Sequence, residues 1–153
     1  MANEISTAGI ALKYAVESTA GTRPTTGFTE IADIKSLSEM GASPDALEVT
    51  NLADTKWKRY IPGLSDLGGD WSCTANMTAA LKTAWAALVT ASETAFASSK
   101  STWFEIVVPN IGSFYFSGRP VEMGFGGAEV NSVSEITLHI VPNGCEGWGT
   151  SST

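Results

Sequence analysis

The chain has 153 residues, of which 43% are apolar and only 16% charged, and 16 acidic against 9 basic residues give a formal net charge of −7. A chain of this length is expected to form one domain, residues 1–153, around a single core. The acidic balance argues against a protein that grips nucleic acid phosphates through Lys and Arg. The few charges leave a neutral surface, which favours a protein that assembles with copies of itself.

Targeting and cysteine signals are weak. The sequence has neither a basic start typical of a signal peptide nor an apolar run of about 18 residues, so we expect synthesis in the cytoplasm and no membrane insertion. Cys73 and Cys145 lack C-x-x-C spacing and a nearby histidine cluster. Both are therefore predicted to be buried free thiols, with no metal or redox site.

Short strands dominate the prediction for the first half of the chain. Apolar residues alternate in "TAGIALKYAVES" (7–18), more weakly in "FTEIADIKSL" (28–37), and again in "DWSCTANM" (70–77). The segment 19–27, "TAGTRPTTG", has the composition of a loop. The period of two predicts strands with one core face and one polar face.

A helix follows these strands. In "TAALKTAWAALVTAS" (78–92), apolar residues recur at helical spacing, and Thr78 is placed as an N-cap. We expect this helix to end before the Ser-rich segment 92–101, which has the composition of a loop. The apolar positions are Leu81, Ala84, Trp85, Leu88 and Val89.

The second half predicts a meander of three strands and a tail. The strands lie in 102–108, 113–123 and 129–141, and the turns between them contain Pro and Gly. Residues 145–153, rich in glycine and without a pattern, are predicted to form a flexible C-terminal arm. The order of elements predicts a mainly β fold, an antiparallel β-sandwich or partly closed barrel with one packed α-helix.

No residue pattern indicates an enzyme, a cofactor site or a metal site. His139, the only histidine, lies in an alternating strand and has no nucleophile or orienting carboxylate at a recognisable spacing. Asp66 and Asp70 lack the rhythm of a calcium loop, and the glycines at 124–127 precede no helix that could bind phosphate. We therefore expect no catalytic residues, no cofactor and no metal.

The segment "KWKRY" (56–60) gathers three of the nine basic residues around two aromatic ones. In an extended conformation each face would carry an aromatic ring beside a cation. This arrangement suits stacking on a nucleobase or a sugar, and it equally suits docking on an acidic protein, including another copy of this acidic chain.

The run "ALEVTNLADTKWKRYIPGLSDLGGDWSCTANM" resembles the major tail tube proteins of long-tailed bacteriophages, and the likeness extends over about residues 28–144. It rests on the order of a "VT…D" element, a charged strand, a "GL.D.G" turn, an alternating strand and a helix. No single motif in this set is specific, but the ordered set is. The matching residues are Val49, Thr50, Asp54, Gly63, Leu64, Asp66 and Gly68.

The resemblance implies a virion tail protein that forms six-membered rings stacked into a tube. The tube houses a tape-measure protein, joins tail tip and tail terminator proteins, and conducts DNA past an acidic wall without binding it tightly. The segment 51–64 would make the contacts between subunits. The expected interface residues are Thr50, Asn51, Asp54, Lys56, Trp57, Lys58, Arg59, Tyr60, Ile61, Pro62, Gly63 and Leu64.

Three alternatives stay open at this point. The chain could be the inner tube protein of a contractile tail or a secretion-like machine, which would require a sheath partner. It could be a monomeric β-sandwich that binds sugars or surfaces. The segment 51–64 could also be a solvated hairpin whose charges have no partner.

Overall fold

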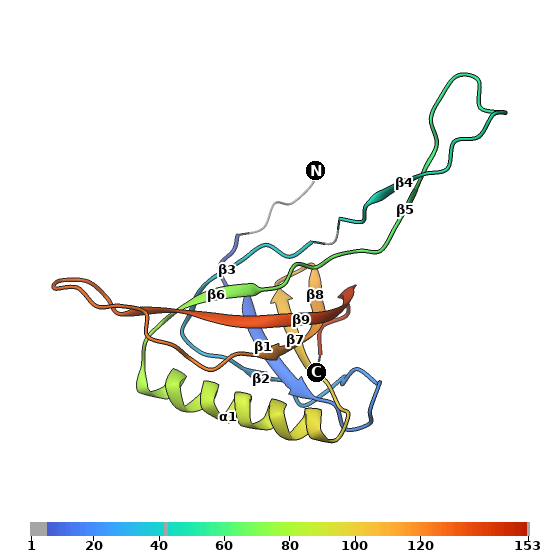
Figure 1. Cartoon of the computed structure of the whole chain (residues 1–153). Helices are drawn as coiled ribbons and strands as arrows, with labels where there is room; N and C mark the ends of the chain where they lie inside the picture. The colour runs from blue at the N-terminus through green and yellow to red at the C-terminus, as the bar shows by residue number, and fades with distance from the viewer. Residues whose placement is uncertain (1–5, 42, 153) are drawn as a thin grey trace.

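A computed structural model describes residues 6–41 and 43–152. Seven antiparallel strands form one sheet in the order β2-β1-β7-β8-β9-β6-β3, two further strands form a separate hairpin, and one helix packs on the sheet (Figure 1). The elements are β1 Ala11–Val16, β2 Thr29–Glu30, β3 Ile34–Leu37, β4 Ala46–Glu48, β5 Tyr60–Pro62, β6 Trp71–Asn76, α1 Ala79–Ala97, β7 Thr102–Val108, β8 Gly112–Pro120 and β9 Glu135–Gly149.

The sheet curls into a partly closed barrel. Its two edge strands, β2 and β3, are joined by residues 31–33 alone, which span at most about 14 Å. Ile31 N donates to Leu12 O on one edge, and Asp33 O accepts from Asn76 N on the other, each at 2.9 Å. The predicted mainly β fold with one packed helix is confirmed, in its partly closed barrel form.

The split between β2 and β3 differs from the single strand predicted over residues 28–37. Asp33 has a φ of 64°, a left-handed conformation that interrupts a strand and that Asp tolerates better than most residues. Its carboxylate also accepts a 2.6 Å hydrogen bond from the hydroxyl of Thr78. The turn at Asp33 therefore carries the chain from one edge of the sheet to the other.

The core lies between α1 and the face of the sheet that alternation predicted to be buried. β6 and β9 pair in register, with Cys73 opposite Leu138, and the residues two positions away on each strand are also buried. Phe116 of β8 stacks on Phe104 at 5.3 Å and lies 5.2 Å from Trp71, measured between ring centroids. Burying each such side chain contributes about 1.5–3 kcal/mol.

Helix α1 is longer than predicted. Thr78 caps it as expected, because its hydroxyl accepts a 3.1 Å hydrogen bond from Leu81 N. The prediction that the helix ends before the segment 92–101 is wrong, since Ser92 and Ala95 are both buried and continue the stripe that contains Leu88. Small residues can extend a packed helical face although they carry little apolar signal.

The predicted flexible arm at 145–153 is also wrong over its described residues, and Thr153 lies outside them. β9 continues to Gly149 and pairs with β8, with Cys145 opposite Phe116. The register shifts twice along this ladder, as expected for a strand with bulges. The glycines that suggested a tail instead allow a bulged strand, and Gly147 has a φ of 84°.

A buried carboxylate holds the residues beyond β9. Glu105 is fully buried and accepts hydrogen bonds from Ser152 N at 2.9 Å, from the Ser152 hydroxyl at 2.6 Å and from the Tyr115 hydroxyl at 3.1 Å. The Tyr115 hydroxyl lies 2.6 Å from the carbonyl oxygen of Thr150. Glu105 therefore fastens the C-terminal segment to the sheet.

The two thiols should differ sharply in reactivity. Cys73 is buried, and burial raises the pKa of its thiol to about 12, whereas Cys145 is exposed, contrary to the prediction. Since the thiolate is the nucleophile, we expect one rapid equivalent with Ellman's reagent in the native protein and a second after denaturation. A Cys145→Ser variant should lose the rapid equivalent. Two rapid equivalents in the native wild type would contradict the burial of Cys73.

Candidate assembly interface

The predicted interface segment forms a hairpin that extends away from the barrel, defined here as residues 45–63 (Figure 1). In its short ladder Leu47 lies opposite Ile61 and Glu48 lies opposite Tyr60. One further backbone hydrogen bond extends the ladder at each end, at 2.7 and 2.9 Å. The hairpin has a backbone ladder of its own, separate from that of the barrel.

Side chains of the hairpin fix the shape of its loop. Asn51 N donates to Asp54 Oδ2 and Ala53 N donates to Asn51 Oδ1, both at 2.9 Å. Thr50 Oγ1 accepts from Arg59 N at 3.0 Å across the loop. Thr50, Asn51 and Asp54 are thus engaged in building the loop, a role that Asn, Asp and Thr often have in turns.

Two of the three cations are paired within the hairpin. Arg59 Nε lies 2.9 Å from Asp54 Oδ2, and Lys58 Nζ lies 3.6 Å from Glu48 Oε2. Exposed pairs of this kind contribute about 0–1 kcal/mol. Lys56 has no carboxylate partner among residues 6–41 and 43–152.

Apolar side chains of the segment face solvent. Leu52, Trp57 and Leu64 are each at least 76% exposed, and the side chains of Tyr60 and Ile61 in β5 are about half exposed. Pro62 ends β5, and Gly63 comes so close to Asp45 that a Cβ would lie 3.1 Å from its carbonyl oxygen. So much exposed apolar surface on one projection is typical of an interaction site.

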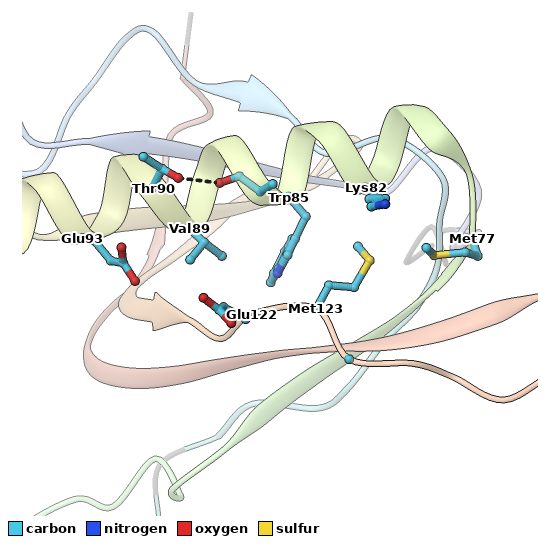
Figure 2. Close-up of a pocket in the computed structure, with 10 residues that line it drawn as sticks. Met77, Lys82, Trp85, Val89, Thr90, Glu93, Glu122 and Met123 are labelled. Atoms are coloured by element: carbon cyan, nitrogen blue, oxygen red, sulfur yellow. Dashed lines mark hydrogen bonds between the residues drawn. The ribbon is translucent and has the colours of Figure 1, made fainter.

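A groove that no pattern in the sequence indicated runs along α1 (Figure 2). It has a volume of about 370 Å³ and lies between the helix and the segment that follows β8. Trp85 and Val89 form its inner wall, and the Trp85 Nε1 donates to Val121 O at 2.8 Å. The apolar stripe of the predicted helix indicated that these two residues are buried, but it did not indicate a groove. The remaining lining residues include Met77, Lys82, Glu93, Glu122 and Met123.

The segment joining β8 to β9, residues 121–134, forms a second projection (Figure 1). Phe125, Val130 and Val133 on it are each more than 70% exposed. The prediction started a strand at residue 129, but β9 begins at Glu135. The apolar residues there lack a regular period, which is the signal that separates an exposed loop from a strand.

The face of β3, β6 and β9 turned away from α1 is small and polar. Ser36, Thr74 and Thr137 lie side by side across the three strands. Lys35 forms an ion pair with Glu135 near one end of this region. The face therefore presents hydroxyl groups, with its lysine neutralised by a carboxylate.

His139 lies exposed on the same face, in a strand as predicted, and the structure gives it a carboxylate partner that no spacing in the sequence indicated. Its Nδ1 lies 2.8 Å from Oδ2 of Asp70. Its cross-strand neighbour Ser72 makes its side-chain hydrogen bond with Ser38, at 3.1 Å, so the pair of described residues Ser72 and His139 does not form a nucleophile and base. A general base acts only within hydrogen-bond reach of the group it deprotonates.

No group of three or more His, Cys, Asp or Glu side chains is placed to hold a metal ion within 6–41 and 43–152. The helix in that part of the chain is not long and apolar enough to cross a membrane.

Comparison with solved structures finds the same fold in chains of phage-like particles. A chain of the anti-feeding prophage baseplate, resolved with six-fold symmetry, has a TM-score of 0.61 at 13% identity and covers 97% of this chain and 98% of its own. A chain from the tail of an empty gene transfer agent particle, refined with C6 symmetry, has a TM-score of 0.57 at 13% identity over 92% of this chain and 96% of its own.

A chain from the virion of a native gene transfer agent also has this fold, with a TM-score of 0.57 at 13% identity over 98% of this chain and 99% of its own. No protein-family model and no curated protein matches the sequence. The likeness spans nearly the whole of each chain and shows a shared fold.

Proposed function

We propose that this protein is a structural, non-enzymatic subunit of a phage tail tube, in which six-membered rings stack into a hollow tube. The observation that carries the proposal is the hairpin, which extends away from the barrel and leaves the side chains of Leu52 and Trp57 exposed to solvent. An isolated subunit gains nothing from such an arrangement, whereas a neighbouring copy can bury these side chains. The fold shared with chains of six-fold tail and baseplate particles supports it.

In this proposal the polar face of β3, β6 and β9 lines the channel. This face carries hydroxyl groups, and its Lys35 is already paired with Glu135, so it has little to bind DNA phosphates. A ring of six subunits carries about 6 × (−7) = −42 formal charges. The net negative charge of the ring repels phosphates, so DNA moves through without being held. Short edge strands would join those of neighbouring subunits, which leaves no bare sheet edge.

The partners follow from this role. The tube encloses a tape-measure protein during assembly, begins on tail tip proteins and ends at a tail terminator protein. The subunit is made in the host cytoplasm and resides in the virion tail. Its other partner is itself, through contacts made by residues 50–64.

The likeness to a baseplate chain favours a second candidate, a ring subunit within a baseplate or the inner tube of a contractile or secretion-like machine. A baseplate subunit would form single rings that do not stack. An inner tube would stack in the same way and would also bind a sheath protein. A sugar-binding module would stay monomeric and bind a glycan saturably.

Electron microscopy of the purified full-length protein over a range of concentrations tests the proposal. We expect six-fold rings and stacked tubes, with subunits and assemblies separated by analytical ultracentrifugation. Single rings at every concentration would favour the baseplate candidate. Monomers at the highest concentration, in the presence and absence of a preformed tail tip, would contradict both.

The net negative charge of the protein predicts the absence of tight DNA binding. Because binding of nucleic acid rests on release of counterions by cations, we expect no gel shift of double-stranded or single-stranded DNA at low salt. A basic single-strand binding protein provides the positive control. A tight shift that weakens steeply with salt would support a nucleic-acid-binding role for the segment 56–60 instead.

A further inference from the structure

The hairpin presents one cation and one indole that its own chain leaves available. The ammonium group of Lys56 lies 6.0 Å from the centre of the Trp57 ring, and Trp57 is 76% exposed. The neighbouring cations Lys58 and Arg59 are already paired within the hairpin. Lys56 and Trp57 together therefore form a positively charged, aromatic knob.

The groove along α1 has the complementary chemistry. Figure 2 shows Glu93 and Glu122 at one end, beside Val89, and Lys82 with Met77 at the other. Neither glutamate has an ion-pair partner within the described ranges 6–41 and 43–152. The groove thus combines an apolar wall with two free carboxylates at a single end.

The knob and the groove of one chain cannot meet. In Figure 1 the hairpin extends from the side of the barrel opposite α1, so the sheet lies between them. A hairpin can therefore reach this groove only on a different copy. A contact between two different surfaces of identical chains is heterologous, and such contacts generate rings or open-ended stacks.

We propose that the groove along α1 is the receptor for the hairpin of a second copy, with the indole of Trp57 against Trp85, Val89 and Met123. The ammonium group of Lys56 then faces Glu93 and Glu122. The orientation of the hairpin in the groove is fixed because Lys82 repels the ammonium group of Lys56 from the other end. This inference rests on the proposed function, in which copies contact each other through the hairpin, and it names the surface that receives it.

Zero-length cross-linking of assembled full-length protein tests the contact directly. A carbodiimide joins Lys56 to Glu93 or Glu122 only if their side chains meet, and mixing unlabelled with 15N-labelled subunits identifies links between copies. We expect mixed-isotope peptides that join Lys56 to one of these glutamates. The pair of Lys58 and Glu48 within the hairpin should give links of a single isotope and serves as an internal control.

Charge reversal provides a second test of the contact between the hairpin and the groove. Lys56→Glu and Glu122→Lys should each weaken assembly at least about tenfold, and the double variant should recover most of that loss because the pair is restored with reversed sign. Glu129→Lys makes the same charge change as Glu122→Lys on the exposed segment outside the groove and should leave assembly unchanged.

The outcomes separate this inference from the proposed function. Wild-type rings or tubes that lack the Lys56 links, or single variants that assemble like the wild type, would overturn the groove as receptor and leave the tube role standing. A double variant that is no better than either single variant would also overturn it. A wild type that never assembles would overturn the tube role and the groove contact together.

Discussion

A Leu52→Ser, Trp57→Ser double variant should fold normally and fail to assemble. Both side chains are at least 76% exposed in the subunit, so their replacement should change the free energy of unfolding by less than about 0.5 kcal/mol. In a packed contact a buried Trp typically contributes about 2–4 kcal/mol, which weakens each contact by at least about 30-fold when it is lost. Sedimentation velocity and electron microscopy measure the loss, and circular dichroism monitors the fold.

Trp148→Ser is the matched control for this variant. Trp148 is 60% exposed, packs edge-on against Phe114 at 5.7 Å and lies at the end of β9, outside residues 45–63. We expect it to assemble, at a small cost in thermal stability. Tubes of normal length from the hairpin variant would show that residues 45–63 do not make the assembly contact.

Replacing Glu105 should cause a large loss of subunit stability. Glu105→Ala removes the acceptor of the Ser152 amide and hydroxyl, while Tyr115 keeps the carbonyl oxygen of Thr150, and hydrogen bonds to charged groups contribute about 1.5–3 kcal/mol. We expect a loss of about 3 kcal/mol, or about 6–12 °C in the melting temperature for a chain of this size. Calorimetry measures it, and amide exchange should show that the segment 150–152 loses protection.

The same carboxylate gives the subunit a definite acid response. Burial by itself raises the pKa of Glu105, but hydrogen bonds from Ser152, Ser113 and Tyr115 outweigh it and hold the pKa below its usual value. A depressed folded-state pKa stabilises the folded state above the unfolded value of about 4.3 and loses that contribution as the pH falls through the folded pKa. Burial also raises the pKa of Glu17, but hydrogen bonds from Ser101, Trp103 and Gly21 outweigh it and hold that pKa below its usual value.

The stability difference between wild type and Glu105→Gln should therefore be constant near neutral pH and shrink as the pH falls below about 4. Glu129→Gln, which removes a carboxylate from an exposed site, is the matched control. A difference that grows on acidification would mean that Glu105 is protonated in the folded subunit, contrary to its hydrogen-bond donors.

The parts of the fold that local pattern determines were predictable. The alternation of Trp71, Cys73 and Ala75 matches β6, and the stripe through Leu81 and Trp85 matches α1 with its Thr78 cap. These elements bury one face against a single core, so the period of apolar residues carries nearly all the information. The same reasoning indicated the meander of β7, β8 and β9, whose turns contain Gly and Pro.

The errors share a different cause. The end of α1, the strand 145–149 and the split at Asp33 depend on small or polar residues that have no local preference strong enough to identify them. Glu105 lies among apolar residues of β7, and nothing in its neighbours indicates that Ser152, 47 residues away, will bond to it. Such long-range partners stabilise a conformation only after the barrel has formed.

For the candidate interface, the sequence by itself determined that residues 50–64 combine cations, aromatic residues and turn formers in an otherwise acidic, weakly charged chain. Only the tertiary structure decided that this segment extends into solvent and that Lys58 and Arg59 form ion pairs within the hairpin. It also decided that Lys56 and Trp57 remain available for contacts with another copy. It also created the groove, because Glu93 on α1 and Glu122 after β8 come together only when the helix packs on the sheet. The composition of a segment can be read from the sequence alone. The exposure of its side chains and their ion pairs depend on which distant residues the fold brings close to them.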